Sequence, residues 1–199
     1  GLDFSKSARR AVSLSKHDWD MFEISSEFKV SPLLYRSDAK IHESFLSYIE
    51  SANAAVDELK EIEQRNNVLV IEHFGIHGEI NAEVPIEEVS LTQNSHYRYS
   101  QLLEQKEFNS RFRSDCTVDF ASFSIGCMLG RFSLDRDGII YAGSENKGFA
   151  EIVAKYAYQT FPADDDGIIP LTDQEWFPDD ATNRFRDFVK VIWGEENIH

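Results

Sequence analysis

The sequence has 199 residues, of which 42% are hydrophobic and 13% aromatic, so the chain can bury a sizeable core and disorder is disfavoured. Its formal net charge is −15, whereas proteins that bind nucleic acid on their own neutralise phosphates with Lys and Arg. Free-standing DNA binding is therefore disfavoured. No apolar run approaches the roughly 18 residues needed to cross a bilayer, and we expect no membrane partner.

The cysteines and the chain ends bear on compartment and context. Two cysteines, Cys116 and Cys127, are too few for a disulfide framework, and we expect a reduced, cytoplasmic setting. The sequence begins at Gly1 without a methionine and ends at His199 without an evident capping element. We interpret it as one helical segment, residues 1–199, of a larger protein.

The N-terminal third has the spacing of helices. Apolar residues within 4–28 predict a helix or helix pair that Ser31-Pro32 ends, followed by an extended connector at residues 33–35. The clearest periodicity predicts a long helix from about 38 to 74, ended by Gly75. Its stripe consists of Ile41, Phe45, Ile49, Ala52, Val56, Leu59 and Ile62. Two glycines, Pro85 and several glutamates then predict a surface loop over residues 75–91.

Residues 96–132 begin polar and end apolar. Lys106, Arg111 and Arg113 form the strongest basic cluster of the sequence, interleaved with aromatic residues (Tyr97, Tyr99, Phe108 and Phe112). Such alternation can contact nucleic acid, which makes the three basic residues candidates for a DNA-facing surface. The alternative, the polar entry of an ordinary amphipathic helix, remains open.

The stretch SIGCMLGRFSLDRDGIIYAG, residues 124–143, is here called the hub. Gly126 and Gly130 are spaced to share one helix face, where another backbone can approach closely. Apolar residues fill the other faces, so this helix is expected to be central. The structural hub residues are Gly126, Gly130, Arg131 and Asp135. Residues 135–138 predict a turn, and any small sheet is expected to involve residues 139–141.

The C-terminal part predicts three shorter helices. Residues 145–161 have amphipathic spacing, Thr172 with Glu175 matches a capping box, and residues 185–192 mark the last helix. The fold class is therefore mainly α. We expect a helical spacer-type bundle in which the helix at about 38–74 packs on a central apolar helix at about 110–132, with little or no β structure. The subregions are an N-terminal arm (1–35), a long helical hairpin (36–132) and a C-terminal helical part (133–199).

Two residue groups invite a metal interpretation. His73 and His77 are separated by the helix-breaking Gly75, and two ligands are fewer than the four that zinc usually takes. The run Asp164 to Asp166 lacks the alternating acidic ladder of a calcium loop, so a solvated turn is the better interpretation. The sequence also has no glycine-rich phosphate loop, no GxSxG and no HExxH. We expect no catalytic, cofactor-binding or metal-binding residue.

Four stretches of the sequence resemble a known family. They are SARRAVSLSKHDWDMFEISSEFKVSPLL (7–34), NNVLVIEHFGIHGEINAEVPIEEVSL (66–91), the hub, and FPADDDGIIPLTDQEWFPDD (161–180). In this order they resemble the PglX-type DNA methyltransferases of BREX phage-defence systems, and the related Eco57I-like restriction–modification methyltransferases. The resemblance covers nearly the whole chain.

The resemblance implies a larger parent enzyme that transfers a methyl group from S-adenosylmethionine to the N6 amine of adenine. The family's Asn-Pro-Pro-Tyr tetrapeptide and glycine-rich cofactor motif have no counterpart here. The implied function is a helical spacer or scaffold, C-terminal to the methyltransferase core, that positions the catalytic and target-recognition parts. Its partners would be the rest of the parent protein and, through it, DNA. The alternative is an acidic protein-interaction module that recruits other components of the defence system.

Overall fold

The computed structural model describes residues 3–35, 40–99, 104–141, 148–155, 157–174 and 176–197. Over these ranges the fold is mainly α-helical, as predicted, and no strand is present. An isolated bridge joins His77 and Ile80, and residues 139–141, where the sequence allowed a short strand, are irregular. The elements are α1 (Ser5–Asp20), η1 (Pro32–Leu34), α2 (Ile41–Phe74), η2 (Ile86–Glu88), α3 (Ser95–Tyr99), α4 (Gln105–Met128), α5 (Phe149–Ala154), α6 (Ala181–Trp193) and η3 (Glu195–Asn197).

The chain divides into two compact units, which are described separately. Unit 1 consists of Gly1–Asp20 and Ser47–Arg113, and unit 2 consists of Met21–Leu46 and Ser114–His199. The two longest helices, α2 and α4, therefore each contribute residues to both units. Helix α2 has 34 residues and so spans roughly 51 Å, in agreement with the predicted long helix.

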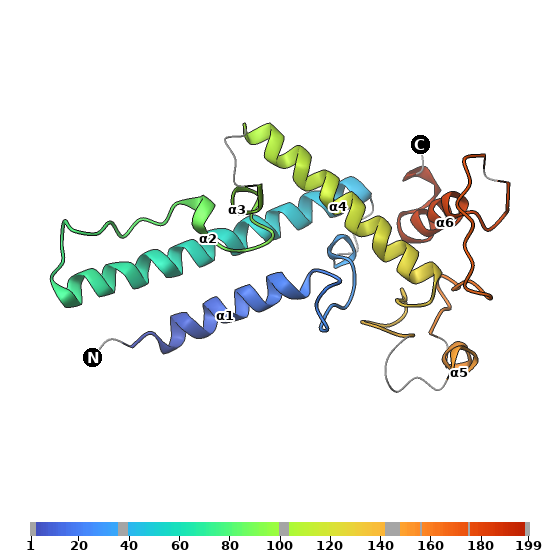
Figure 1. Cartoon of the computed structure of the whole chain (residues 1–199), viewed down its shortest axis with the longest axis horizontal. Coiled ribbons are helices and arrows are strands. Elements are labelled where there is room, and N and C mark those ends of the chain that lie inside the picture. Colours follow the sequence, from blue (N-terminus) through green and yellow to red (C-terminus); the bar gives the residue numbers. More distant parts are fainter. Residues whose placement is uncertain are drawn as a thin grey trace. The chain divides into compact units, whose positions relative to one another are not determined.

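Unit 1 is built on one apolar face of α2. Helix α1 runs beside α2 (Figure 1), and the Arg10 guanidinium makes two 2.6 Å hydrogen bonds to the Glu58 carboxylate across them. Tyr48 of α2 packs on Phe112 of α4 with ring centroids 5.6 Å apart, so the predicted packing of the long helix on the central helix is confirmed here.

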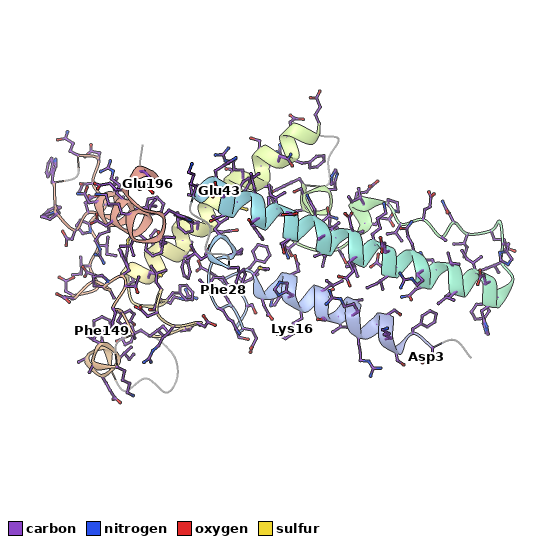
Figure 2. All side chains as sticks on the ribbon, turned by 180° about the vertical axis from the view of Figure 1, so that it is seen from behind. Asp3, Lys16, Phe28, Glu43, Phe149 and Glu196 are labelled. Carbon is purple, nitrogen blue, oxygen red and sulfur yellow. The ribbon has the colours of Figure 1, made fainter. Side chains whose placement is uncertain are left out.

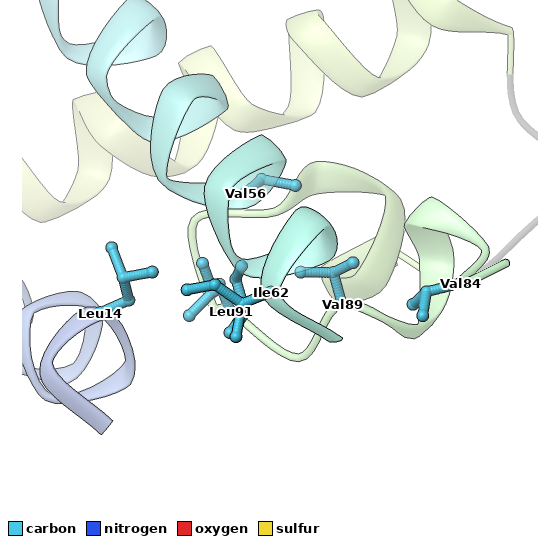
Figure 3. Packing of buried hydrophobic residues seen from close by; sticks show 7 residues of the cluster. Leu14, Val56, Ile62, Val84, Val89 and Leu91 are labelled. Atoms are coloured by element: carbon cyan, nitrogen blue, oxygen red, sulfur yellow. The ribbon is translucent and has the colours of Figure 1, made fainter. Parts of the chain in front are cut away.

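Residues 75–91 are mostly exposed and contain no α-helix or strand, as predicted for a surface loop, but three of their apolar residues belong to the core of unit 1. Gly75 has φ = +66° and turns the chain back along α2, where Asn67 Nδ2 donates to the Ala82 carbonyl at 3.3 Å. Three apolar residues of this segment are then buried against α1 and α2 (Figure 3). The cluster contains Leu14, Val56, Leu59, Ile62, Val84, Val89 and Leu91.

A buried carboxylate fixes the end of α1 in unit 1. Asp18 is only 4% exposed and accepts backbone hydrogen bonds from Thr92 at 2.7 Å and Gln93 at 2.8 Å. Helix α1 ends two residues later at Asp20, earlier than the predicted helix over 4–28. The residues that follow form turns, with Phe28 buried in unit 2.

Unit 2 has an aromatic core. Phe28 packs edge-on against Phe123 and Phe132 (Figure 2), with ring centroids 6.0 and 5.3 Å away. Helix α6, predicted over 185–192, adds Phe188 and Trp193, and the indole Nε1 of Trp193 donates to Ser44 Oγ at 3.1 Å.

Three short elements of unit 2 differ from the prediction. The 3-10 turn η1, Pro32–Leu34, with Leu33 buried, takes the place of the extended connector expected at residues 33–35. The amphipathic stretch 145–161 forms a helix only over the six residues of α5 among those described. No helix begins at Thr172, and Glu175, the other half of the predicted capping box, lies outside the described residues.

Candidate functional site

The hub terminates α4 with a Schellman motif. The Arg131 amide donates to the Gly126 carbonyl at 2.8 Å, and the Gly130 amide donates to the Cys127 carbonyl at 3.1 Å. Gly130 has φ = +73°, the left-handed conformation that this motif requires after a helix. The central helix therefore ends at Met128, and Phe132 lies beyond it, which corrects the predicted end near residue 132.

Gly126 makes room for a ring, and not for another backbone as predicted. A Cβ added at Gly126 would lie 2.5 Å from Cδ2 of Phe132, whose ring folds back over the last turn of α4. The helix end is also not surrounded by core on every face, as its apolar composition led us to expect, because Ile125 and Leu129 are 47% and 42% exposed. The hub is buried on one side and open on the other.

Three carbonyl groups at the end of α4 and just after it accept hydrogen bonds from other parts of unit 2. Met128 O accepts from the Asp164 amide at 2.7 Å, Gly130 O accepts from the Tyr158 hydroxyl at 2.6 Å, and Arg131 O accepts from the Ile140 amide at 2.8 Å. These bonds satisfy acceptors that a helix end otherwise leaves to solvent. They make the hub a structural junction.

Arg131 and Asp135, the charged residues of the hub, both have structural contacts. The Arg131 guanidinium lies 5.1 Å from the centre of the Phe132 ring. Asp135 accepts from the Thr160 amide at 2.9 Å and also from the Thr160 hydroxyl. Burial opposes ionisation of Asp135, yet the hydrogen bonds from Thr160 prevail and lower its pKa.

Glu23 is a half-buried carboxylate near the hub that sequence reasoning missed. Burial raises its pKa, while a hydrogen bond with Ser122 and the charge of Arg131 act in the opposite direction. Its Oε1 is buried and has no hydrogen-bond partner among the residues that the structure describes. Nothing in the local pattern, a glutamate in an apolar N-terminal stretch, signals this environment.

Neither cysteine has the surroundings of a nucleophile. Both Cys116 and Cys127 are free and buried. Burial, together with the nearby charge of Glu23, strongly raises the pKa of the Cys127 thiol. Since the thiolate is the reactive form, Cys127 is inert at neutral pH.

The basic cluster separates from its aromatic neighbours. Arg111 and Arg113 are exposed on α4, while the side chain of Lys106 lies outside the described residues. Phe108 and Phe112, which alternate with them in sequence, are 7% and 3% exposed and belong to the core of unit 1. Stacking of bases on these two rings is thereby excluded. Of the other two aromatic residues of the pattern, Tyr97 is 44% exposed and Tyr99 is half-buried. The two arginines can offer a nucleic acid charge and hydrogen-bond donors.

The acidic turn at Asp164 is closed by its own backbone. Asp164 Oδ2 accepts from the amides of Asp166, Gly167 and Ile168 at 2.8–3.2 Å. Burial disfavours its charge, but these hydrogen bonds lower its pKa overall. Among the described side chains, no group of three or more potential metal ligands comes together, either here or around His73 and His77.

Asp180 is a second buried carboxylate that the sequence did not reveal. Its side chain is fully buried, accepts from the Thr182 amide at 2.9 Å as the N-cap of α6, and accepts from Thr172 through the amide at 2.9 Å and the hydroxyl at 2.6 Å. The hydrogen bonds from Thr172 and Thr182 lower the pKa of Asp180. Asp180 therefore both caps the N-terminus of α6 and holds Thr172 by two hydrogen bonds.

The described surface of unit 1 has an open hollow of about 320 Å³ beside α3. Its lining combines three apolar side chains with polar ones, and it comprises Ile49, Asn53, Val56, Asp57, Ile86, Asn94, Ser95, His96 and Asn109. The Asn94 amide is already committed, donating to the carbonyls of Ile86 and Val89, and its oxygen accepts from the His96 amide. The hollow contains no nucleophile paired with a base.

The sequence of the chain is similar to segments of two adenine-specific methyltransferases. Over 191 residues, or 96% of this chain, the sequence is 42% identical to the adenine-specific methyltransferase BrxX of Escherichia coli O9:H4 (strain HS). It is 27% identical over 195 residues to the adenine-specific methyltransferase PglX of Lacticaseibacillus casei (strain Zhang). The chain spans only 16% and 14% of the lengths of these two relatives.

The chain is therefore homologous to one segment of the BrxX/PglX type of adenine-specific methyltransferase, and the resemblance found in the sequence is confirmed. No family model matches the sequence. Within the described residues, no helix is both long enough and apolar enough to cross a membrane.

Proposed function

We propose that this chain is a helical spacer segment of a longer, S-adenosylmethionine-dependent adenine-N6 DNA methyltransferase of a phage-defence (BREX) or restriction–modification system. The observation that carries the proposal is the 42% identity across 96% of this chain but only 16% of the relative. The segment lies C-terminal to the catalytic core, in the cytoplasm, and holds the catalytic and target-recognition parts of the parent protein in position.

The internal use of polar groups supports a structural role. Asp18, Asp135 and Asp180 each accept hydrogen bonds that join segments of the fold, and both cysteines are buried. A catalytic carboxylate or thiol has to face the reacting atoms. The cofactor and DNA would then be bound by other parts of the longer protein, with Arg111 and Arg113 as candidate phosphate contacts. The subregions 1–35, 36–132 and 133–199 remain a prediction.

The experiment that tests the spacer role shortens the far end of α2 in the longer methyltransferase. Residues 68–81 are replaced by a short Gly-Asn turn that joins Asn67 to Ala82, which already lie within hydrogen-bonding distance. A spacer predicts that methylation falls by about a hundredfold, as displaced reacting groups do, while S-adenosylmethionine affinity is unchanged. Ile80→Ser, an exposed substitution that keeps the length, is the control.

Two results would contradict the proposal. The shortened methyltransferase could methylate as fast as the unmodified protein, which would exclude a spacing role for α2. Calorimetry could also detect micromolar binding of S-adenosylmethionine to the isolated 199-residue chain, which would place cofactor chemistry inside this segment.

A second candidate function is an acidic module that recruits other proteins of the defence system. The net charge of −15 favours it, because such a surface repels DNA and attracts basic proteins. Here the shortened α2 would leave methylation intact. The distinguishing measurement is co-purification of other defence-system proteins with the longer methyltransferase, and its loss when residues 1–199 are removed.

A further inference from the structure

Residues 168–177, between α5 and α6, expose an unusual concentration of large apolar side chains. Leu171 is 81% exposed, Trp176 is 70% exposed, and Ile168 and Phe177 are also largely open to solvent. We refer to residues 168–177 as the apolar loop. Clustered exposed apolar side chains mark interaction sites, and aromatic residues are enriched at the centres of interfaces.

The apolar loop is held closed by hydrogen bonds. Asp180 binds both the amide and the hydroxyl of Thr172, and the Thr172 hydroxyl in turn accepts from the Trp176 amide at 3.2 Å. The indole Nε1 of Trp176 donates to Gln174 Oε1 at 3.0 Å, which orients the ring. A loop ordered before binding loses less conformational entropy when a partner covers it.

The charges around the apolar loop indicate the chemistry of what covers it. The sequence from 161 to 183 contains no Lys or Arg, while Asp165, Asp166, Asp173 and Asp179 are all exposed. The nearest cations that follow are engaged within the unit: Arg184 lies over the Phe161 ring and donates to the Pro162 carbonyl, and Arg186 donates to Asn183 Oδ1. A phosphate backbone or an anionic lipid surface would be repelled. A protein surface with an apolar hollow rimmed by Lys and Arg complements both features.

The small size of the loop indicates where such a surface comes from. Stable association of separate proteins usually buries more than about 1,000 Å², far more than four side chains supply. A surface within the same polypeptide needs less area, because the tether keeps it at a high effective concentration. In both relatives more than four fifths of the polypeptide lies outside the matched segment.

We infer that the apolar loop docks into a basic-rimmed apolar hollow in another region of the same longer methyltransferase. The inference rests on the proposed function for the existence of that polypeptide, but a spacer requires no such docking loop. Trp176 and Leu171 are the anchors, and Asp165, Asp173 and Asp179 face the basic rim.

The experiment places a photoreactive residue in the longer methyltransferase by the substitution Trp176→p-benzoylphenylalanine. The matched control is Val118→p-benzoylphenylalanine, which is 64% exposed on α4 of the same unit. We expect position 176 to cross-link to a Lys- and Arg-rich peptide outside residues 1–199, with a yield about tenfold above the control. A second variant of the longer methyltransferase keeps Trp176 and carries both Leu171→Ser and Asp173→Lys. In this double variant the protease should cut the partner region faster than in the unmodified protein.

Several outcomes would overturn the inference: yields at position 176 equal to those of the control, cross-links confined to residues 1–199, or cross-links to DNA or to a separate protein. Intact mass of the purified protein first establishes that the segment is part of a longer polypeptide. An intact mass equal to that of the 199-residue chain alone would contradict the proposed function. The cross-linking yields test the docking contact separately. Circular dichroism of the variant 199-residue chain checks that the helices remain folded.

Discussion

At the scale of single residues, the stability of the fold depends on a few positions. At some of them an added methyl group is expected to lower the free energy of unfolding, and at others the loss of a charged group is. Gly126 is the sharpest case. The Phe132 ring occupies the space where any larger residue would place its Cβ. Since Phe132 also stacks on Phe123, with centroids 5.3 Å apart, the ring has little room to retreat.

Gly126→Ala should therefore destabilise the protein by about 1–3 kcal/mol, the usual cost of overpacking a core. The measurement is the free energy of unfolding in urea. In a Phe132→Leu background, which lacks the clashing ring atoms, Gly126→Ala should change the free energy of unfolding very little. Equal destabilisation of both backgrounds would show that the ring is not the cause.

Asp180 gives a pH-dependent prediction at the same scale. Its pKa is lowered by Thr172 and Thr182, so it lies below the value near 4 of an unfolded aspartate. The stability that Asp180 contributes is thus fully present above about pH 4 and is lost as the pH falls through the lower, folded pKa.

Asp180→Asn should lower the urea midpoint at neutral pH and make the fall toward about pH 3 shallower. The measurement is the unfolding midpoint from about pH 6 to about pH 3. Asp179→Asn, an exposed neighbour, serves as the control and should leave the curve unchanged. An unchanged acid limb in Asp180→Asn would exclude this carboxylate as a stabilising anion.

At the scale of elements, α1 is joined to the returning segment by Asp18. Replacement of Asp18 by Ala leaves the amides of Thr92 and Gln93 without their acceptor. Unpaired buried donors cost about 1–3 kcal/mol, and Asp18→Ala should lower the free energy of unfolding by that amount. Asp20→Ala, which breaks a surface ion pair with Lys16, should cost about 0.5 kcal/mol or less.

Hydrogen exchange gives a second readout for Asp18. The amides of Thr92 and Gln93 should exchange faster in Asp18→Ala, while those of α6 keep their protection. Uniform loss of protection throughout both units would instead indicate global destabilisation without a local role for this carboxylate.

The elements also show what a sequence can predict. Helix α2 was predicted to within three residues at its start and correctly at its end, because a three-to-four spacing and a following glycine are local signals. The burial of Val84, Val89 and Leu91 was not predicted, since these positions have no regular period. Their burial depends on Gly75 turning the chain back along α2.

The candidate site shows the same division. Gly126 and Gly130 were singled out from the sequence as positions of close approach, because two glycines four residues apart share a helix face. The ring of Phe132 as the group that approaches Gly126, and the end of α4 just before Gly130, were not predicted.

Asp18 was missed, since its partners Thr92 and Gln93 lie 74 and 75 residues away. Asp180 was missed although it is the N-cap of α6 and Thr182 lies two residues away, because Thr172 was assigned to a capping box with Glu175. The aromatic residues between the basic side chains were open to two interpretations, and only burial shows that Phe108 and Phe112 serve the core.

At the scale of the whole molecule, the negative net charge determines how the prediction of a DNA-facing surface can be tested. The isolated chain, with a net charge of −15, should not bind duplex DNA measurably at physiological salt. In the longer methyltransferase, Arg111→Ala with Arg113→Ala should weaken DNA binding and reduce the slope of log affinity against log salt by about two.

The control for this pair is Arg9→Ala, an equally exposed basic residue on α1 of the same unit. It should leave the salt slope unaltered. A slope that is the same in the double variant and in the unmodified protein would exclude Arg111 and Arg113 as phosphate contacts.

The burial of both native thiols has a practical consequence. Cys116 and Cys127 lie inside the aromatic and apolar core, and Cys127 resists ionisation. A cysteine introduced on an exposed position, such as one replacing Val118, would react with a maleimide dye far faster than either of them. Residues 1–199 thus accept a fluorophore at a chosen position without removal of native cysteines, which opens the segment to energy-transfer distance measurements in solution.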